Sequence, residues 1–227
     1  MKTKHVLVPL ALALFGGTAY AQQQPAPAAA PPAPQPQGPM TFFVTSVGKG
    51  DGANLGGIAG ADAHCKALAT AVGRGNAEWR AYMSVAAANG QAQINARDRI
   101  GKGPWYNAKG VPIAWNIDDL HQDRNNIRKP TALNEKGEEV NGVGNTPNTH
   151  DMLTGSDSAG RLVPGAAANT TCNNWTSNGA GSAMLGHHDR LGGGTASWNS
   201  VHSSRSCSQP DLVATGGAGL FYCFVAQ

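Results

Sequence analysis

Four cysteines constrain this chain more than any other feature of its sequence, and they stand at Cys65, Cys172, Cys207 and Cys223. An even number of cysteines predicts disulfides in an exported protein, and the lack of a CxxC pair argues against zinc or redox chemistry at these residues. Four cysteines allow three pairings, and the sequence alone leaves all three open. Joining Cys65 to Cys223 would tie the two ends of the domain together, so we favour this nested pairing, with Cys172 bonded to Cys207.

Export is predicted by the first residues of the chain. Lys2 and Lys4 precede an apolar run over residues 6–15, and Ala19-Tyr20-Ala21 is a small-x-small cleavage site. This pattern is typical of a secretory signal peptide, which we place at residues 1–21. The apolar run is shorter than the roughly 20 residues needed to cross a bilayer. We therefore expect a periplasmic or extracellular protein with no integral membrane segment after signal cleavage.

A spacer and a single domain follow. Residues 22–39 contain only Gln, Pro, Ala and Gly, so they lack the large apolar side chains that a core requires, and we expect a disordered spacer. Residues 40–227 have the length of one domain with a hydrophobic core. Lys2 and Lys4 account for two of the 17 lysines and arginines, so 15 basic and 14 acidic residues follow the signal peptide. With charges so balanced, nucleic acid is not an expected partner.

The pattern of apolar residues predicts an α+β domain. Residues 61–72 form the clearest helix, since Cys65, Leu68, Ala69 and Val72 would share one buried face. Aromatic, β-branched or alternating segments predict strands at residues 41–47, 79–85, 151–155, 171–177, 183–186 and 220–226. The order of these elements contains no βαβ repeat. We therefore expect mixed or antiparallel sheets, one main helix and long ordered loops.

Five stretches of the domain carry a family resemblance: residues 60–65 (GADAHC), 79–84 (WRAYMS), 153–161 (LTGSDSAGR), 171–175 (TCNNW) and 221–225 (FYCFV). The Gly-Ser-Asp-x-x-Gly-Arg element, followed by a cysteine and then a tryptophan, is the most specific. In order and spacing these stretches resemble endostatin, a compact variant of the C-type-lectin-like fold. The resemblance covers residues 40–227, and it implies that fold together with the nested disulfides. It points to a free-standing, bacterial-type secreted relative that is lectin-like.

Departures from that family limit which of its properties are expected here. The zinc ligands of endostatin lie in a histidine-rich N-terminal segment, which the Pro/Ala/Gln spacer replaces here, so we predict no metal there. Calcium-binding C-type lectins use a Trp-Asn-Asp strand, whereas this chain has Trp198-Asn199-Ser200. Its Gln209-Pro210-Asp211 lies after Cys207 rather than before it. The family's calcium motif is thus incomplete, and we predict no cofactor.

Residues 173–205 combine aromatic and planar polar side chains, a combination typical of sugar-binding loops. We therefore predict lectin-like recognition of a glycan or polysaccharide by this segment. The candidate ligand-binding residues are Asn173, Asn174, Trp175, His187, His188, Asp189, Arg190, Trp198 and Asn199. For Trp175, three residues after a cysteine, core packing against the disulfide is the stronger alternative, and for Trp198 the two interpretations are balanced.

Two other functions remain as alternatives. A non-catalytic protein–protein or envelope-structural module would bind an extracytoplasmic protein, with the spacer giving it reach. A hydrolase could combine Asp189 or Asp151 with His150 or His188, because such groups need only meet in space. The chain has none of the common catalytic motifs, so we expect no enzyme. We also predict no metal at His187 and His188, since neighbours on a strand point to opposite faces and do not easily share an ion.

Overall fold

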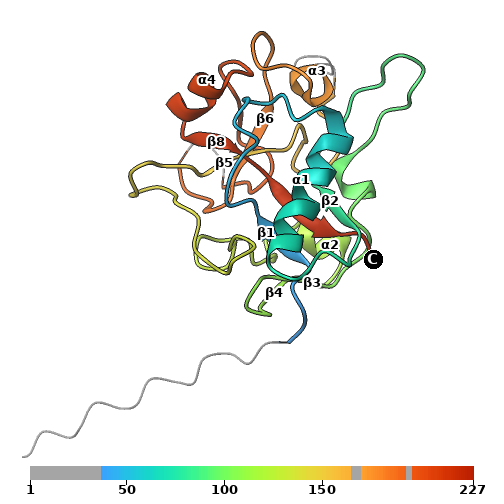
Figure 1. The fold of residues 1–227 in the computed structure, drawn as a ribbon, viewed down its shortest axis with the longest axis vertical. Helices are drawn as coiled ribbons and strands as arrows, with labels where there is room; N and C mark the ends of the chain where they lie inside the picture. Colours follow the sequence, from blue (N-terminus) through green and yellow to red (C-terminus); the bar gives the residue numbers. More distant parts are fainter. Residues whose placement is uncertain (1–36, 165–169, 193–195) are drawn as a thin grey trace, which may run out of the picture. The chain divides into compact units, whose positions relative to one another are not determined.

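The computed structural model describes residues 37–164, 170–192 and 196–227 (Figure 1). The signal peptide expected at residues 1–21 lies outside this part of the chain, as does all of the expected spacer except residues 37–39. Within the described residues, no helix is both long enough and apolar enough to span a bilayer.

Short strands and helices alternate with long loops in the described chain. In order, the elements are β1 (Phe42–Val44), α1 (Gly57–Ala71), β2 (Trp79–Ala81), the 3-10 turn η1 (Ala96–Asp98), β3 (Trp105–Tyr106), β4 (Pro112–Ala114), α2 (Ile117–Leu120), β5 (Asp151–Leu153), α3 (Cys172–Trp175), β6 (Met184–His187), β7 (His202–Ser203), α4 (Gln209–Ala214), β8 (Gly217–Leu220) and β9 (Tyr222–Val225). The predicted α+β class is confirmed. The main helix, α1, is the one that the apolar spacing predicted.

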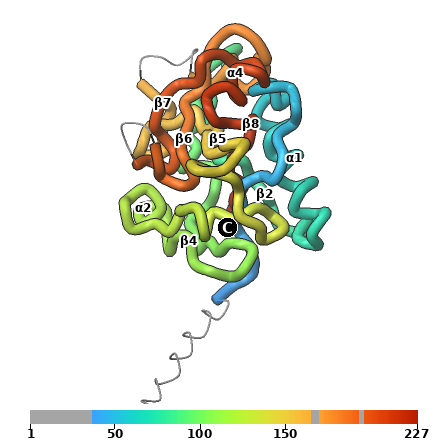
Figure 2. Tube along the Cα trace, turned by 90° about the vertical axis from the view of Figure 1, so that its left-hand side faces the viewer, coloured from blue at the N-terminus to red at the C-terminus, as the bar shows by residue number. Residues whose placement is uncertain are grey.

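The described strands form three small sheets. In the first, β1 and β2 flank β9, and all neighbours are antiparallel, so Phe43 lies opposite Cys223 near the end of the chain. A second sheet has the order β7-β6-β5-β8, with only β5 and β8 parallel (Figure 2). Strands β3 and β4 form the third. This arrangement agrees with the expected mixed and antiparallel pairing.

Helix α1 joins the first sheet through a disulfide. It buries Ala61, Cys65 and Ala69, which share one face of the helix as the spacing predicted. Cys65 is bonded to Cys223 in β9, and the second disulfide joins Cys172 to Cys207. All four cysteines are fully buried. The nested pairing is therefore confirmed, and the larger of its two loops links the first helix to the last strand.

The strand expected at residues 171–177 is wrong, because α3 forms a tight turn there. Cys172, Asn173, Asn174 and Trp175 have φ values between 47° and 67°, in the left-handed region that side chains with a Cβ disfavour. The side chain of Asn174 holds this turn by bonding to both the N–H and the C=O of Ala86, at 2.8 and 3.0 Å. Local propensity is thus overridden by contacts 88 residues away in the sequence.

A polar group of three side chains lies within the aromatic core. The hydroxyl of Tyr82 contacts His121 Nε2 at 2.7 Å and accepts a hydrogen bond from Asn199 Nδ2 at 2.9 Å. His121 Nδ1 donates to the carbonyl of Ile117 at 2.7 Å, which leaves Nε2 to accept from Tyr82. A Cβ on Gly160 would lie 2.2 Å from His121 Nε2, so this position in the Gly-Ser-Asp-x-x-Gly-Arg element requires glycine.

This arrangement predicts acid-sensitive stability. Burial lowers the pKa of His121 from 6.5 to about 4. Between these values the unfolded chain binds a proton that the folded chain does not, so stability is lost as the pH falls from about 6.5 to about 4, by at most about 3 kcal/mol. Urea unfolding at pH 7 and pH 4 would measure this loss. The His121→Gln variant should lose less stability over the same interval, and an equal loss in both proteins would contradict the assignment.

Candidate metal centre

Three strands of the second sheet bring histidines and a carboxylate together. His150 precedes β5, which begins at Asp151, and the register of β5 with β6 places Asp151 opposite His187. Strand β7 begins at His202 and pairs with β6 on its other side. We refer to His150, Asp151, His187 and His202 as the His–Asp cluster. Its members lie up to 52 residues apart in the sequence, and sheet pairing alone makes them neighbours.

Three members of the cluster, His150, Asp151 and His187, offer ligand atoms that all lie within 4.8 Å of one another, close enough to share one small ion, whereas His202 stands beside this group. Asp151 Oδ1 lies 3.0 Å from His187 Nε2 and 3.4 Å from His150 Nε2. His202 Nε2 lies 3.6 Å from the same oxygen and 3.1 Å from His187 Nε2. Ligand atoms about 2.0–2.1 Å from a tetrahedral ion would lie about 3.3 Å from one another. The observed distances scatter around that value.

The Asp151 carboxylate has no hydrogen-bond partner among the described residues. Its side chain is 1% exposed, and neither oxygen meets hydrogen-bond geometry with any group, although three imidazole nitrogens lie within 3.6 Å of Oδ1. An uncompensated buried carboxylate costs several kcal/mol. A cation shared with the imidazoles would remove that cost, because it satisfies the carboxylate and the nitrogen lone pairs at once.

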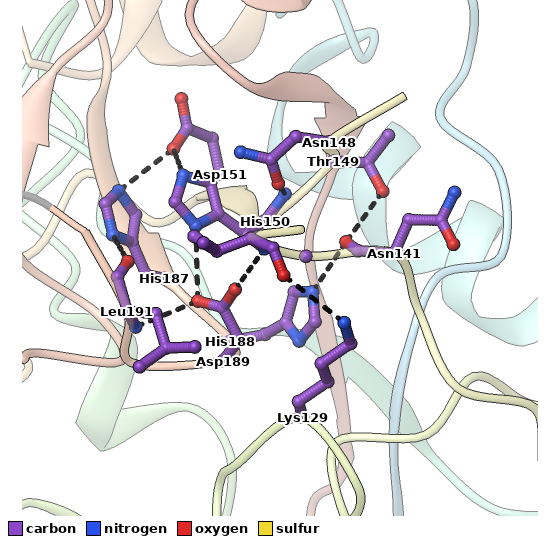
Figure 3. Close-up of polar contacts among 12 residues, drawn as sticks. Lys129, Asn141, Asn148, Thr149, His150, Asp151, His187, His188, Asp189 and Leu191 are labelled. Atoms are coloured by element: carbon purple, nitrogen blue, oxygen red, sulfur yellow. Dashed lines mark hydrogen bonds and ion pairs between the residues drawn. The ribbon is translucent and has the colours of Figure 1, made fainter. Parts of the chain in front are cut away.

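The outer nitrogens of the three imidazoles face oxygen acceptors. His150 Nδ1 lies 3.2 Å from Asp189 Oδ1, His187 Nδ1 lies 2.8 Å from the carbonyl of Leu191, and His202 Nδ1 lies 3.2 Å from the carbonyl of Ser203. These acceptors favour a proton on each Nδ1 and a lone pair on each Nε2. Neutral imidazoles oriented in this way are typical of metal sites, where the outer acceptors fix the ligand geometry. Figure 3 shows two of these contacts, from His150 to Asp189 and from His187 to Leu191.

Asp189 is the ionised outer partner of His150. Burial opposes ionisation of this carboxyl, but hydrogen bonds from His150 and from the backbone N–H groups of Val143 and Leu191 outweigh burial and lower its pKa. A Cβ on Gly142 would lie 2.4 Å from Asp189 Oδ2, so glycine makes room for the carboxylate. Of the nine candidates from the sequence, Asp189 thus supports the cluster without entering it.

A proton competes with any cation for the cluster. Burial disfavours the charged form of His187, but Asp151 outweighs burial and raises the pKa of this imidazole. A proton on His187 is thus the alternative to a cation as the counter-charge of the Asp151 carboxylate.

His188 lies apart from the cluster, as the alternation of a strand requires. Its Nε2 contacts the carbonyl of Asn141 at 3.0 Å, and burial lowers its pKa (Figure 3). His187 and His188 thus do not share a site. The metal-like geometry instead joins His187 to His150 and Asp151, which the sequence interpretation had not selected as metal ligands.

The remaining candidates do not form one surface. The indole N–H of Trp175 donates to the carbonyl of Ser84 at 2.9 Å, and that of Trp198 donates to the carbonyl of Leu120 at 3.1 Å, so both rings serve the core. Four candidates fall into two further groups: Asn173 and Asn174 belong to the α3 turn, whereas Arg190 and Asn199 line a pocket together with the edge of Trp198.

The chemistry of the cluster also limits its reactions. Among the described residues, no serine or threonine hydroxyl is hydrogen-bonded to a histidine of the cluster, so the contacts of a serine-type hydrolase are not present. Three imidazole nitrogens suit calcium poorly, because calcium takes six to eight oxygen ligands. Scans against protein-family models and against curated proteins found no match to this chain, so the assignment depends on the geometry itself.

Proposed function

We propose that this domain is an extracytoplasmic module that binds one divalent transition-metal ion through the His–Asp cluster. The observation that supports this most is the buried Asp151 carboxylate, which lacks any hydrogen bond while three imidazole nitrogens surround it. Nitrogen from imidazole and oxygen from a carboxylate suit zinc, and also copper, nickel and iron. Zinc prefers four ligands in a tetrahedron, and His150, Asp151 and His187 would supply three of them.

The role we infer is retention of the ion rather than catalysis. His150, Asp151 and His187 would supply three ligands of a tetrahedral site, and His202, with its Nε2 3.6 Å from Asp151 Oδ1, shields the remaining side. The His202 side chain is 37% exposed and the other three are at most 7% exposed, so the ion would enter and leave on the His202 side. A bound ion would also link β5, β6 and β7, which makes it a structural element of the second sheet.

Zinc titration tests the proposal. We expect one zinc ion per chain with sub-micromolar affinity, measured by competition with a chromophoric chelator. Asp151→Asn and His187→Gln each remove a direct ligand and should weaken binding at least about 100-fold, because loss of even an outer partner typically costs 10–100-fold. The metal-free variants must first show the circular dichroism spectrum of the parent protein.

His64→Gln is the matched control for zinc binding by any surface histidine. His64 lies on α1, where its ring contacts the carbonyl of Val47 at 2.8 Å, and it takes no part in the cluster. This variant should bind zinc as the parent does. If Asp151→Asn retains the affinity of the parent, or if His64→Gln loses it, the cluster is not the site.

Glycan recognition by an exported, C-type-lectin-like domain is the second candidate function. The nested disulfides, the pairing of β1 with β9 and the long loops support that fold. The observation that favours a ligand is a pocket of about 360 Å³, lined by residues of the segment expected to bind glycans, among them Arg190, Trp198 and Asn199. Binding of a saccharide series to the purified protein tests this function independently of zinc.

A further inference from the structure

Arg190 lies in the wall of the pocket of about 360 Å³ described above, and its charge is poorly balanced. It follows β6 in a left-handed conformation, with φ of 54°, and its side chain is only 8% exposed. Its Nε has no hydrogen-bond partner among the described residues. The carboxylate nearest to it belongs to Asp123, at 3.9 Å, and that side chain is fully exposed. A buried guanidinium held by one distant, solvated carboxylate is incompletely paired.

A second cation adds to the positive charge of the pocket region. Burial, together with the nearby charge of Arg128, lowers the pKa of Arg190 to about 10, so the Arg190 guanidinium remains charged at neutral pH. Arg128 donates hydrogen bonds to neutral groups, the carbonyls of Asn125 and Ile127, at 3.3 and 2.8 Å. It therefore adds positive charge beside Arg190. The described surroundings of Arg190 therefore carry two cations against one exposed carboxylate, which favours binding of an anion.

The rest of the pocket is neutral and polar. Exposed Gln122 and Ser158 stand at its rim, and Asn199 and Trp198 form part of its wall. The amide of Asn199 is engaged by Tyr82 and by the carbonyl of Asp157, so this wall is rigid rather than adaptable. The groups left to meet a ligand are thus the Arg190 guanidinium, the Ser158 hydroxyl and the NH2 of Gln122, whose Oε1 accepts from Arg124 at 3.1 Å.

We propose that this pocket binds a sugar of the uronic acid class, with the ligand carboxylate on Arg190 and its hydroxyls on the rim. A guanidinium binds a carboxylate through two parallel N–H donors, which supplies both charge and orientation. The inference rests on glycan recognition, the second function proposed above, and is independent of the metal centre. Asp123 acts as the internal competitor that an incoming carboxylate displaces.

Glucuronic acid and glucose form the matched pair of probes, since they differ at one carboxylate. Binding to the zinc-treated protein is measured by ligand-observed NMR, with acetate and inorganic phosphate as anions that are not sugars. We expect glucuronic acid to bind at least about tenfold more tightly than any of the other three. Arg190→Met should weaken glucuronic acid at least about tenfold, whereas Asp123→Asn, at an exposed position, should tighten it by about two- to fivefold.

The outcomes separate this inference from the function on which it rests. Equal binding of glucose and glucuronic acid, unchanged in Arg190→Met, would overturn the inference while leaving glycan recognition intact. Binding of acetate or phosphate as tight as that of glucuronic acid would reduce the pocket to a general anion site and overturn the sugar assignment. Binding of neither sugar would overturn both proposals. Should Arg190→Met not fold, Asp123→Asn still decides, because weaker or unchanged binding of glucuronic acid contradicts the inference.

Discussion

Replacing both Cys65 and Cys223 by alanine is expected to lower the free energy of unfolding by up to about 5 kcal/mol. The bond closes a loop with a sequence separation of 158, so its loss restores a large amount of conformational entropy to the unfolded chain. It also removes the covalent link between α1 and the central strand of the first sheet. Urea unfolding of the oxidised parent and of the double variant measures the difference.

The second disulfide supplies the control. Cys172 and Cys207 are separated by 35 residues, and their replacement by alanine should cost about 4 kcal/mol on the same grounds. Both pairs are fully buried, so the two double variants create similar small cavities and differ chiefly in loop length. If replacing Cys172 and Cys207 lowers the free energy of unfolding more than replacing Cys65 and Cys223 does, loop length does not determine which disulfide stabilises the fold more. Peptide mapping that returned free thiols or other partners would contradict the pairing itself.

The sequence predicted those parts of the fold whose cause is local. Gly73, with φ of 75°, follows the end of α1 as expected of a helix stop, and the alternation around Trp79 gives strand β2. The start of α1 was missed by four residues, because Gly57 and Gly60 do not favour a helix. A Cβ on Gly60 would lie 1.9 Å from the carbonyl of Leu55, so close packing rather than helix propensity explains this glycine.

The candidate site could be predicted only in part, because its geometry depends on strand register. Asp189 and His187 were selected as candidates from the sequence, but for hydrogen bonding to a sugar rather than for holding a metal. The His150-Asp151 pair gave no recognisable ligand motif, since its partners follow 36 and 51 residues later. Only the pairing of Asp151 with His187, and of β6 with β7, brings these residues together. A search for patterns along the sequence does not reveal which strands pair or in which register.

Zinc at about 1,000 times its dissociation constant is expected to raise the free energy of unfolding by about 4 kcal/mol, provided that it binds the folded chain alone. For a domain of this size that corresponds to a rise in Tm of about 8–16 °C. Differential scanning fluorimetry of the chelator-treated protein, with and without zinc, measures the shift, and added chelator should reverse it.

The same measurement distinguishes a built site from casual binding of zinc by histidines. Because Asp151 is buried and its oxygen lies within 3.6 Å of all three imidazole nitrogens, Asp151→Asn should abolish the zinc-dependent rise in Tm. His64→Gln should preserve it, since that ring lies outside the cluster. A zinc response that survives Asp151→Asn would mean that zinc binds outside the cluster. In that case the cluster is a buried ion pair within the sheet, and the domain's ligand must be sought at the Arg190 pocket.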